Sequence, residues 1–429
     1  MILKLATFVL LGLLLGTDAR SLATKTTTTV ADKPRAVAAP AIPTSTLISD
    51  FQKNNVSSRW AEGHPKVWGS EKVKFEGPFV AEVSPDERFV GLAYGNNLTI
   101  RDLNTTELVS SVKIEYEGSA DRVTIFSGLN GGYDVFVHTY NYSTHDAITS
   151  LHLSPEGTVI GEQTQYLGGF SSFDGTHGPF SHDGQRFIAL TGANLRNDVA
   201  IIYDVDKPES NITLTGHTDS IMSAAFSPDG KYVSTTAWDS YSKIWNASTG
   251  ELIHTFGPTG GQNWLTNFSP DGKYVLMANA GKNTAVNIWP VANFSSEPIV
   301  FNGFNDWVRQ ASWTSDNKLL AIGCYGLVLV VSVEDQKVLQ RWESEDKHGY
   351  ETWSLTWIES ESRLKLAYRE TAGLEMYDFE TNLKYRWGPD DYAQYNGGGS
   401  GGDTVVIKSK SLIGGTDADG SVRLYDFPI

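Results

Sequence analysis

Residues 215–256, TGHTDSIMSAAFSPDGKYVSTTAWDSYSKIWNASTGELIHTF, decide the fold. This stretch alternates short β-rich runs with turn residues. The runs are Ile221–Phe226, Tyr232–Ala237, a third run that ends at Trp245, and Leu252–Phe256, and the turns between them contain Ser-Pro-Asp-Gly, Asp-Ser and Thr-Gly. Short runs separated by such turns are typical of β-hairpins. The stretch therefore predicts one four-stranded antiparallel sheet.

At these residues the sequence resembles the WD-repeat family of β-propellers, whose repeats carry Gly-His near the start and Trp-Asp near the end. The corresponding pairs are Gly216-His217 and Trp245-Asn246, so Asn246 stands where the family usually has Asp. The resemblance implies a relay of hydrogen bonds across the sheet, formed by Asp239, His217, Thr235 and Trp245. In this motif the histidine and the aspartate serve packing, so we predict a structural role for them rather than a catalytic one.

The same pattern recurs along the chain. The last residue of each first strand gives eight anchors, spaced by roughly 42 to 54 residues: Val83, Phe126, Phe180, Phe226, Phe268, Trp313, Trp357 and Ile407. The turn after the anchor repeats as SPDE, SGLNGG, SHDG, SPDG, SPDG and TSDN in the first six units. Such a period with four strands per unit is typical of propeller blades. We predict an all-β, eight-bladed β-propeller; seven blades is the alternative if the weakly marked second unit is an insertion.

The two ends of the repeat region predict how the ring closes. The chain finishes with the third strand of the last blade, at Tyr425-Asp426-Phe427, and no fourth strand follows. A lone β-type run at residues 72–76 precedes the first blade. We expect this N-terminal strand to complete the last blade, because otherwise a sheet edge would stay open.

The residues before the propeller divide into two predicted parts. Residues 1–19 resemble a secretory signal peptide, with Lys4 before an apolar run at residues 5–15 and cleavage expected after Ala19. Residues 20–71 form a Thr/Pro/Ala-rich linker and N-terminal extension, and residues 72–429 form the WD-repeat-like propeller. We therefore expect a secreted, extracellular glycoprotein. The predicted N-glycosylation sites are Asn55, Asn97, Asn104, Asn141, Asn211, Asn246 and Asn293.

The composition excludes several classes of partner. The chain has 429 residues, a net charge of −16 and a pI near 5.0. Nucleic-acid-binding surfaces are basic, and an anionic membrane surface repels an acidic chain, so we expect neither partner. Beyond the signal, no run is long and apolar enough to span a membrane. Cys324 is the single cysteine, which excludes an intrachain disulfide.

The candidate binding residues come from the position four residues before each anchor. In a propeller the innermost strands begin there and surround one mouth of the central channel, on what we call the mouth face. Trp and Arg at such positions are typical of binding hot spots. The candidates are Met222, Trp264, Trp307, Arg309, Trp353 and Asp403. A second interpretation stays open, in which the tryptophans fill space between blades.

The sequons favour the mouth face as the binding surface. The turns between third and fourth strands lie on the opposite face of a propeller, and four sequons are expected there: Asn104, Asn211, Asn246 and Asn293. A glycan is bulky, so a partner binds more easily on the face that carries fewer of them.

Recognition of a protein, a peptide or a glycan is the predicted function, and an extracellular propeller enzyme of the quinone-dependent dehydrogenase, lactonase or lyase type is the alternative. The mouth positions offer one acid, Asp403, and no histidine for such chemistry. Residues 398–402 match G-x-S-x-G without the strand and helix that a nucleophile elbow needs. His177 and His182 lack a tight metal-binding spacing. We expect no enzymatic activity, no cofactor and no metal, and a monomeric protein.

Overall fold

The computed structural model describes residues 71–75, 80–128, 131–141, 146–170, 179–192, 198–280, 284–304, 306–343, 352–359, 364–370, 373–379, 383–387, 404–416 and 421–426. The predicted signal peptide, almost all of the predicted linker, Asn55, His177, Asp403 and the glycine-rich run 398–402 lie outside the described residues.

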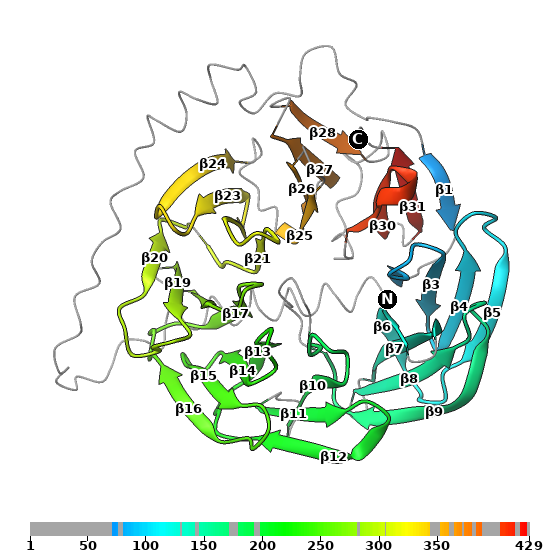
Figure 1. Cartoon of the computed structure of the whole chain (residues 1–429), viewed down its shortest axis with the longest axis horizontal. Coiled ribbons are helices and arrows are strands. Elements are labelled where there is room, and N and C mark those ends of the chain that lie inside the picture. Colours follow the sequence, from blue (N-terminus) through cyan, green and yellow to red (C-terminus); the bar gives the residue numbers. More distant parts are fainter. Residues whose placement is uncertain are drawn as a thin grey trace.

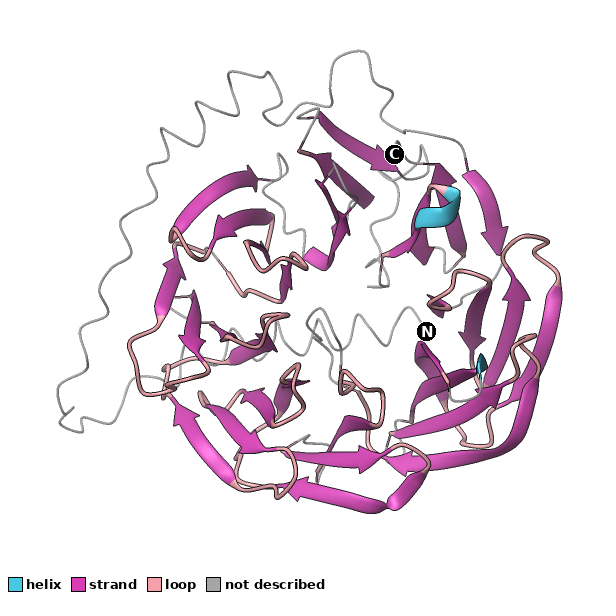
Figure 2. Cartoon of the chain, viewed as in Figure 1, coloured by secondary structure: helices cyan, strands magenta, loops and turns pink. Residues whose placement is uncertain are grey.

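Eight antiparallel sheets follow one another in chain order around a ring (Figure 1). In each blade the first strand lies nearest the axis of the ring, and the last strand lies at the rim. The prediction of eight blades is confirmed, and the seven-bladed alternative is wrong. Figure 2 shows that strands make up nearly all of the regular structure, with a short 3-10 turn, η3 (Lys408–Lys410), in the last blade.

The first four blades come from the N-terminal half of the repeat region. The first contains β2 (Val80–Val83), β3 (Phe89–Tyr94), β4 (Asn97–Asp102) and β5 (Leu108–Lys113). The second contains β6 (Ser119–Ser127), β7 (Tyr133–Tyr140), β8 (Ala147–Leu153) and β9 (Val159–Leu167). The third contains β10 (Arg186–Thr191), β11 (Val199–Asp204) and β12 (Lys207–Leu214), with the anchor Phe180 joined to Phe187 by an isolated bridge. The fourth contains β13 (Ile221–Phe226), β14 (Tyr232–Ala237), β15 (Ser242–Asn246) and β16 (Leu252–Phe256).

The remaining four blades continue the ring. The fifth contains β17 (Asn263–Phe268), β18 (Tyr274–Asn279), β19 (Ala285–Pro290) and β20 (Ile299–Asn302). The sixth contains β21 (Gln310–Trp313), β22 (Leu319–Cys324), β23 (Leu327–Ser332) and β24 (Lys337–Glu343). The seventh contains β25 (Thr352–Glu359), β26 (Leu364–Glu370), β27 (Gly373–Asp378) and β28 (Leu383–Trp387). The eighth contains β29 (Val405–Ile407), β30 (Leu412–Thr416), β31 (Val422–Asp426) and, from the other end of the repeat region, β1 (Glu71–Phe75).

The N-terminal strand closes the ring, as predicted. β1 pairs antiparallel with β31, with Lys74 opposite Arg423 and Phe75 opposite Val422. Figure 1 shows the two strands, blue and red, side by side at the outer side of the last blade. Phe75 is buried in a cluster with residues of the first and last blades, so the closure is sealed by a side chain as well as by backbone pairing.

The repeated turn after the first strand has a simple chemical basis. Its Ser or Thr hydroxyl donates a hydrogen bond to the Asp carboxylate two residues later, at 2.6–2.8 Å in the blades where it is described. The fourth residue of the turn adopts a left-handed backbone, with φ from 58° to 68°, which favours Gly or Asn. The residues at this position are Glu87, Gly184, Gly230, Gly272 and Asn317.

Glu87 departs from this preference, and its side chain explains why. Its carboxylate accepts hydrogen bonds from the backbone N–H groups of Lys408 and Ser409, both at 2.8 Å. Burial alone would raise the pKa of Glu87, but a hydrogen bond from the Ser409 side chain, together with these backbone hydrogen bonds, outweighs it and lowers the pKa. The side chain thus links the first blade to the last, and an unfavourable backbone conformation is retained at a position that reinforces ring closure.

The hydrophobic core lies between neighbouring blades. Two of the predicted anchors show the arrangement, because each indole N–H donates a hydrogen bond to the preceding blade. Trp313 donates to the side-chain oxygen of Asn267 at 3.1 Å, and Trp357 donates to the backbone oxygen of Ser312 at 2.8 Å. Both tryptophans are buried, so they fix adjacent blades through packing and through one oriented polar contact.

Candidate functional site

A repeated irregularity of the innermost strands creates the mouth positions. In β13 the register shifts between Ile221 and Ser223, so Met222 has no partner in β14. The same shift occurs around Trp264 in β17, between Asn263 and Leu265, and around Trp353 in β25, between Thr352 and Ser354. A bulge of this kind re-aims one side chain out of the regular alternation. The sequence position chosen by counting back from the anchors therefore coincides, in three blades, with a bulged residue.

Side chains from the fourth, fifth and sixth blades meet at these positions. The rings of Trp264 and Trp307 stack with centroids 4.9 Å apart and an interplanar angle of 22°. The guanidinium of Arg309 lies 4.6 Å from the Trp264 ring centroid and 5.0 Å from that of Trp307. Trp238, from the turn after β14, packs against Trp264 at 5.2 Å. We call Trp238, Trp264, Trp307 and Arg309 the tryptophan–arginine cluster.

Burial divides this cluster into a base and an accessible part. Trp264 is only 5% exposed and joins the same hydrophobic cluster as the buried Met222. Trp307 and Arg309 are half-buried, so a partner can reach them. Both sequence interpretations thus find support: Trp264 fills space between blades, and it supports a stacked Trp–Arg pair near the surface. The Trp353 side chain and Asp403 lie outside the described part of the chain.

Sequence reasoning missed a polar cluster at the mouth position of the second blade. The register of β6 shifts between Ala120 and Arg122, which makes Asp121 the bulged residue. His138, on β7, contacts Asp121 through Nδ1 at 2.5 Å, and its Nε2 lies 3.7 Å from an oxygen of Asp146. The signal was the extra length of β6: Asp121 lies five residues before the anchor Phe126, whereas a count of four residues leads to Arg122.

The charge of this cluster is set by the two carboxylates. Burial alone would lower the pKa of His138, but the charges of Asp121 and Asp146 and the hydrogen bond with Asp121 outweigh it and raise the pKa to about 9. His138 is therefore protonated at neutral pH. The exposure of the two side chains is also the reverse of what nucleophilic catalysis needs. In such a site the histidine must reach the substrate, and the aspartate lies behind it. Here His138 is 6% exposed, whereas the side chain of Asp121 is 49% exposed.

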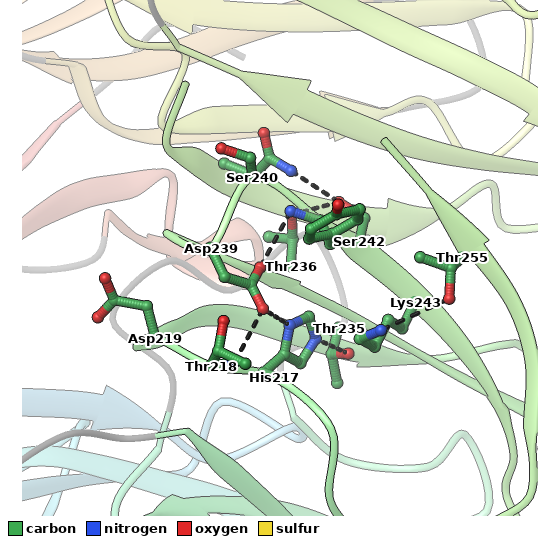
Figure 3. A network of polar contacts seen from close by, with 12 residues as sticks. His217, Thr218, Asp219, Thr235, Thr236, Asp239, Ser240, Ser242, Lys243 and Thr255 are labelled. Carbon is green, nitrogen blue, oxygen red and sulfur yellow. Dashed lines mark hydrogen bonds and ion pairs between the residues drawn. The ribbon is translucent and has the colours of Figure 1, made fainter. Parts of the chain in front are cut away.

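The four residues of the predicted relay form one chain of hydrogen bonds in the fourth blade, and Figure 3 shows its Asp239–His217–Thr235 part. His217 contacts Asp239 through Nδ1 at 2.8 Å and Thr235 through Nε2 at 2.8 Å. The indole N–H of Trp245 donates to the same Thr235 hydroxyl at 2.8 Å. Every polar hydrogen of the relay side chains forms a hydrogen bond if His217 is neutral with its proton on Nδ1 and the Thr235 hydroxyl donates to Nε2. His217, Thr235 and Trp245 are buried, which fits a packing role.

Comparison with known proteins agrees with this geometry. Residues 208–246 match the WD40 family, described as WD domain, G-beta repeat. The matched segment runs from β12 at the rim of the third blade through the first three strands of the fourth, and it contains the whole relay. The protein is a WD-repeat β-propeller. Propellers of this family typically serve as protein-interaction modules.

Several known proteins resemble parts of this WD-repeat propeller. An uncharacterized WD repeat-containing protein of Synechocystis sp. is 35% identical over 103 residues, or 24% of this chain and 28% of the relative. Human apoptotic protease-activating factor 1 is 30% identical over 29% of this chain and 10% of the relative. The serine-threonine kinase receptor-associated protein of Gallus gallus is 26% identical over 25% of this chain and 29% of the relative. The matches therefore span less than a third of each of these relatives.

The family departure at Asn246 has a local explanation in the WD-repeat propeller. The Asn246 side-chain oxygen accepts hydrogen bonds from the backbone N–H groups of Ser248 and Thr249, at 2.9 and 3.0 Å. In the first blade a single oxygen of Asp102 accepts the equivalent hydrogen bonds from the backbone N–H groups of Asn104 and Thr105. One oxygen is enough for this turn, so the amide of Asn246 can replace the carboxylate. These contacts do not need the amide nitrogen.

The remaining candidate sites of the WD-repeat propeller are distributed as follows. Asn97, Asn104, Asn211 and Asn293 are exposed, and Asn141 and Asn246 are half-buried. Two placements differ from the expectation: Asn211 lies on β12, and Asn246 is the last residue of β15, so neither lies between the third and fourth strands. His182 lines a small cavity of about 130 Å³ near the anchors of the second to fourth blades, away from the mouth face.

Two negative findings apply to the described residues alone. No group of three His, Cys, Asp or Glu side chains among them is placed to hold a metal ion. None of their helices has the length and apolar character needed to cross a membrane.

Proposed function

We propose that this propeller is an interaction module that binds a protein partner on its mouth face, through the tryptophan–arginine cluster. The observation that carries the proposal is the stack of Trp264, Trp307 and Arg309, which come from neighbouring blades and converge where the innermost strands begin. Arg309 is pre-positioned by two rings, so it loses little conformational freedom when a partner binds. Tryptophan and arginine together are the residue types most enriched among binding hot spots.

The enzymatic alternative has less support. The Asp–His pair at the second blade is inverted for catalysis, since the buried His138 cannot reach a substrate without moving Asp121. We therefore keep recognition as the proposed function, with an unidentified protein partner and no catalytic residue assigned.

Replacing Trp307 by Ala together with Arg309 by Gln should weaken binding of the partner at least about tenfold, because the accessible half of the cluster is lost. The measurement is a pull-down from extracellular medium, with affinities of each captured protein for the wild type and for the variant. Trp289→Ala is the matched control: Trp289 is a half-buried tryptophan of the fifth blade, near the end of β19 that lies away from the mouth face. A protein retained equally by all three forms would bind elsewhere on the propeller.

We propose in addition that the protein is secreted and N-glycosylated. The support is the apolar run at residues 5–15 after Lys4, together with four sequon asparagines whose side chains are exposed. An exposed asparagine can carry a bulky glycan without disturbing the core. The protein collected from the medium of expressing eukaryotic cells should begin near residue 20, and its mass should fall on enzymatic deglycosylation. An N-terminal Met1 with an unchanged mass would contradict both parts.

A further inference from the structure

A second charged point lies on the mouth face, across the ring from the tryptophan–arginine cluster. Asp121 belongs to the second blade and Arg309 precedes the first strand of the sixth, four blades away in a ring of eight. Figure 1 shows β6 and β21 on opposite sides of the axis. Asp121 also occupies the same bulged position as Met222 and Trp264. The two points therefore both lie where a first strand begins, and they carry opposite charges.

The buried His138 holds the Asp121 carboxylate in a fixed orientation. Its partner among the described residues is His138, at 2.5 Å, and this histidine is enclosed so tightly that a Cβ on Gly169 would lie 2.4 Å from Nε2. Nε2 has no hydrogen-bond acceptor within the described structure, and Asp146 lies 3.7 Å away. If Asp121 rotated away, a buried imidazolium would lose its best contact, which is costly. The carboxylate is thus fixed by one oxygen, and the other is available at a half-exposed position.

We propose that Asp121 is a specificity-determining residue of the mouth face and accepts a lysine or arginine side chain of the protein partner; this inference rests on the proposed function. A pre-oriented carboxylate oxygen forms a charge-assisted hydrogen bond with an ammonium or guanidinium group. The net charge of −16 favours the approach of a basic segment. His138 is the positioning residue. The opposite charges of Asp121 and Arg309 then fix the direction in which a segment crosses the ring.

The test is affinity selection of a displayed library of random twelve-residue peptides by the whole protein. Peptides selected by the wild type should be enriched in Lys or Arg at one position. Asp121→Asn should lose this enrichment, and a synthetic selected peptide should bind it about fivefold more weakly than the wild type. Asp121→Asn combined with His138→Gln covers the case in which the single variant folds poorly, because no buried charge is left unpaired.

Asp206→Asn is the matched control for this experiment. Asp206 is also half-exposed and paired with a histidine, His152 at 3.2 Å, but it lies in the turn between β11 and β12, on the face away from the mouth. This variant should keep the basic preference. Wild-type peptides without basic enrichment, or enrichment that survives in both Asp121 variants, would overturn the inference while the proposed function stands. If selection does not depend on Trp307 and Arg309, the proposed function fails, and the inference fails with it.

Discussion

A chain that begins at residue 76 should aggregate or melt far below the full-length protein, because β1 is the strand that closes the ring. Without it, β31 presents an unpaired edge, and such edges promote association with other chains. Phe75 also leaves its place among Leu92, Val422 and Leu424. Removing one buried phenylalanine side chain costs about 3–5 kcal/mol, a large share of the 5–15 kcal/mol that stabilises a typical domain. Thermal melting and size-exclusion chromatography measure the effect.

The control is a chain that begins at residue 70, which keeps β1 and should melt close to the full-length protein. A synthetic peptide of residues 70–77, added to the shorter chain, should restore part of the stability by pairing with β31 as an added strand. If the shorter chain is instead a monomer with an unchanged melting temperature, the last blade does not depend on β1, and the closure described above contributes nothing to stability.

The blade count could be predicted because it depends on local chemistry that repeats, and the closure could be predicted because a lone strand precedes the first blade while the last blade lacks a fourth. The turn after each anchor requires a hydroxyl, a carboxylate and a residue that tolerates positive φ, and Ser-Pro-Asp-Gly in the fourth and fifth blades meets all three requirements. The relay could be predicted for a similar reason, since His217, Thr235, Asp239 and Trp245 belong to one blade and one motif.

The candidate site could be predicted only in part because its contacts cross between blades. Counting back from the anchors found Trp264 and Arg309, but their stacking depends on how the fifth and sixth blades pack, which no local pattern encodes. The pairing of Asp121 with His138 depends on a one-residue shift of register in β6. A shift of one residue in a strand changes which side chain leaves the regular alternation, so counting alone selected the wrong residue there.

His217→Ala should lower the free energy of unfolding by about 1–3 kcal/mol, the cost of leaving buried hydrogen-bonding groups without partners. The substitution removes one of the hydrogen bonds of the Asp239 carboxylate at one end and the acceptor of the Thr235 hydroxyl at the other. Trp245 keeps its contact with Thr235, so we expect the blade to form and to melt earlier. Chemical denaturation gives the free energy, and circular dichroism confirms that the variant is folded.

His254→Ala is the matched control in the same blade. His254 lies on β16, is half-buried, and within the described residues makes ring contacts with Phe256 and Phe294 rather than hydrogen bonds. We expect its loss to cost less than about 1 kcal/mol, as for substitutions that leave no buried polar group unpaired. Equal effects of the two substitutions would show that the relay adds nothing beyond the general loss of an imidazole.

The dependence on pH distinguishes the relay from simple packing. Burial alone would raise the pKa of Asp239, but hydrogen bonds from His217, Thr218 and Tyr241 outweigh it and lower the pKa. Because the folded pKa lies below the unfolded value, this carboxylate stabilises the fold above its ordinary pKa, and the contribution disappears as the pH falls through the folded pKa. The stability difference between wild type and His217→Ala should therefore be full near neutral pH and shrink on acidification. A difference that stays constant down to pH values where carboxylates protonate would mean that His217 acts by filling space, and that the Asp239 contact contributes no stability.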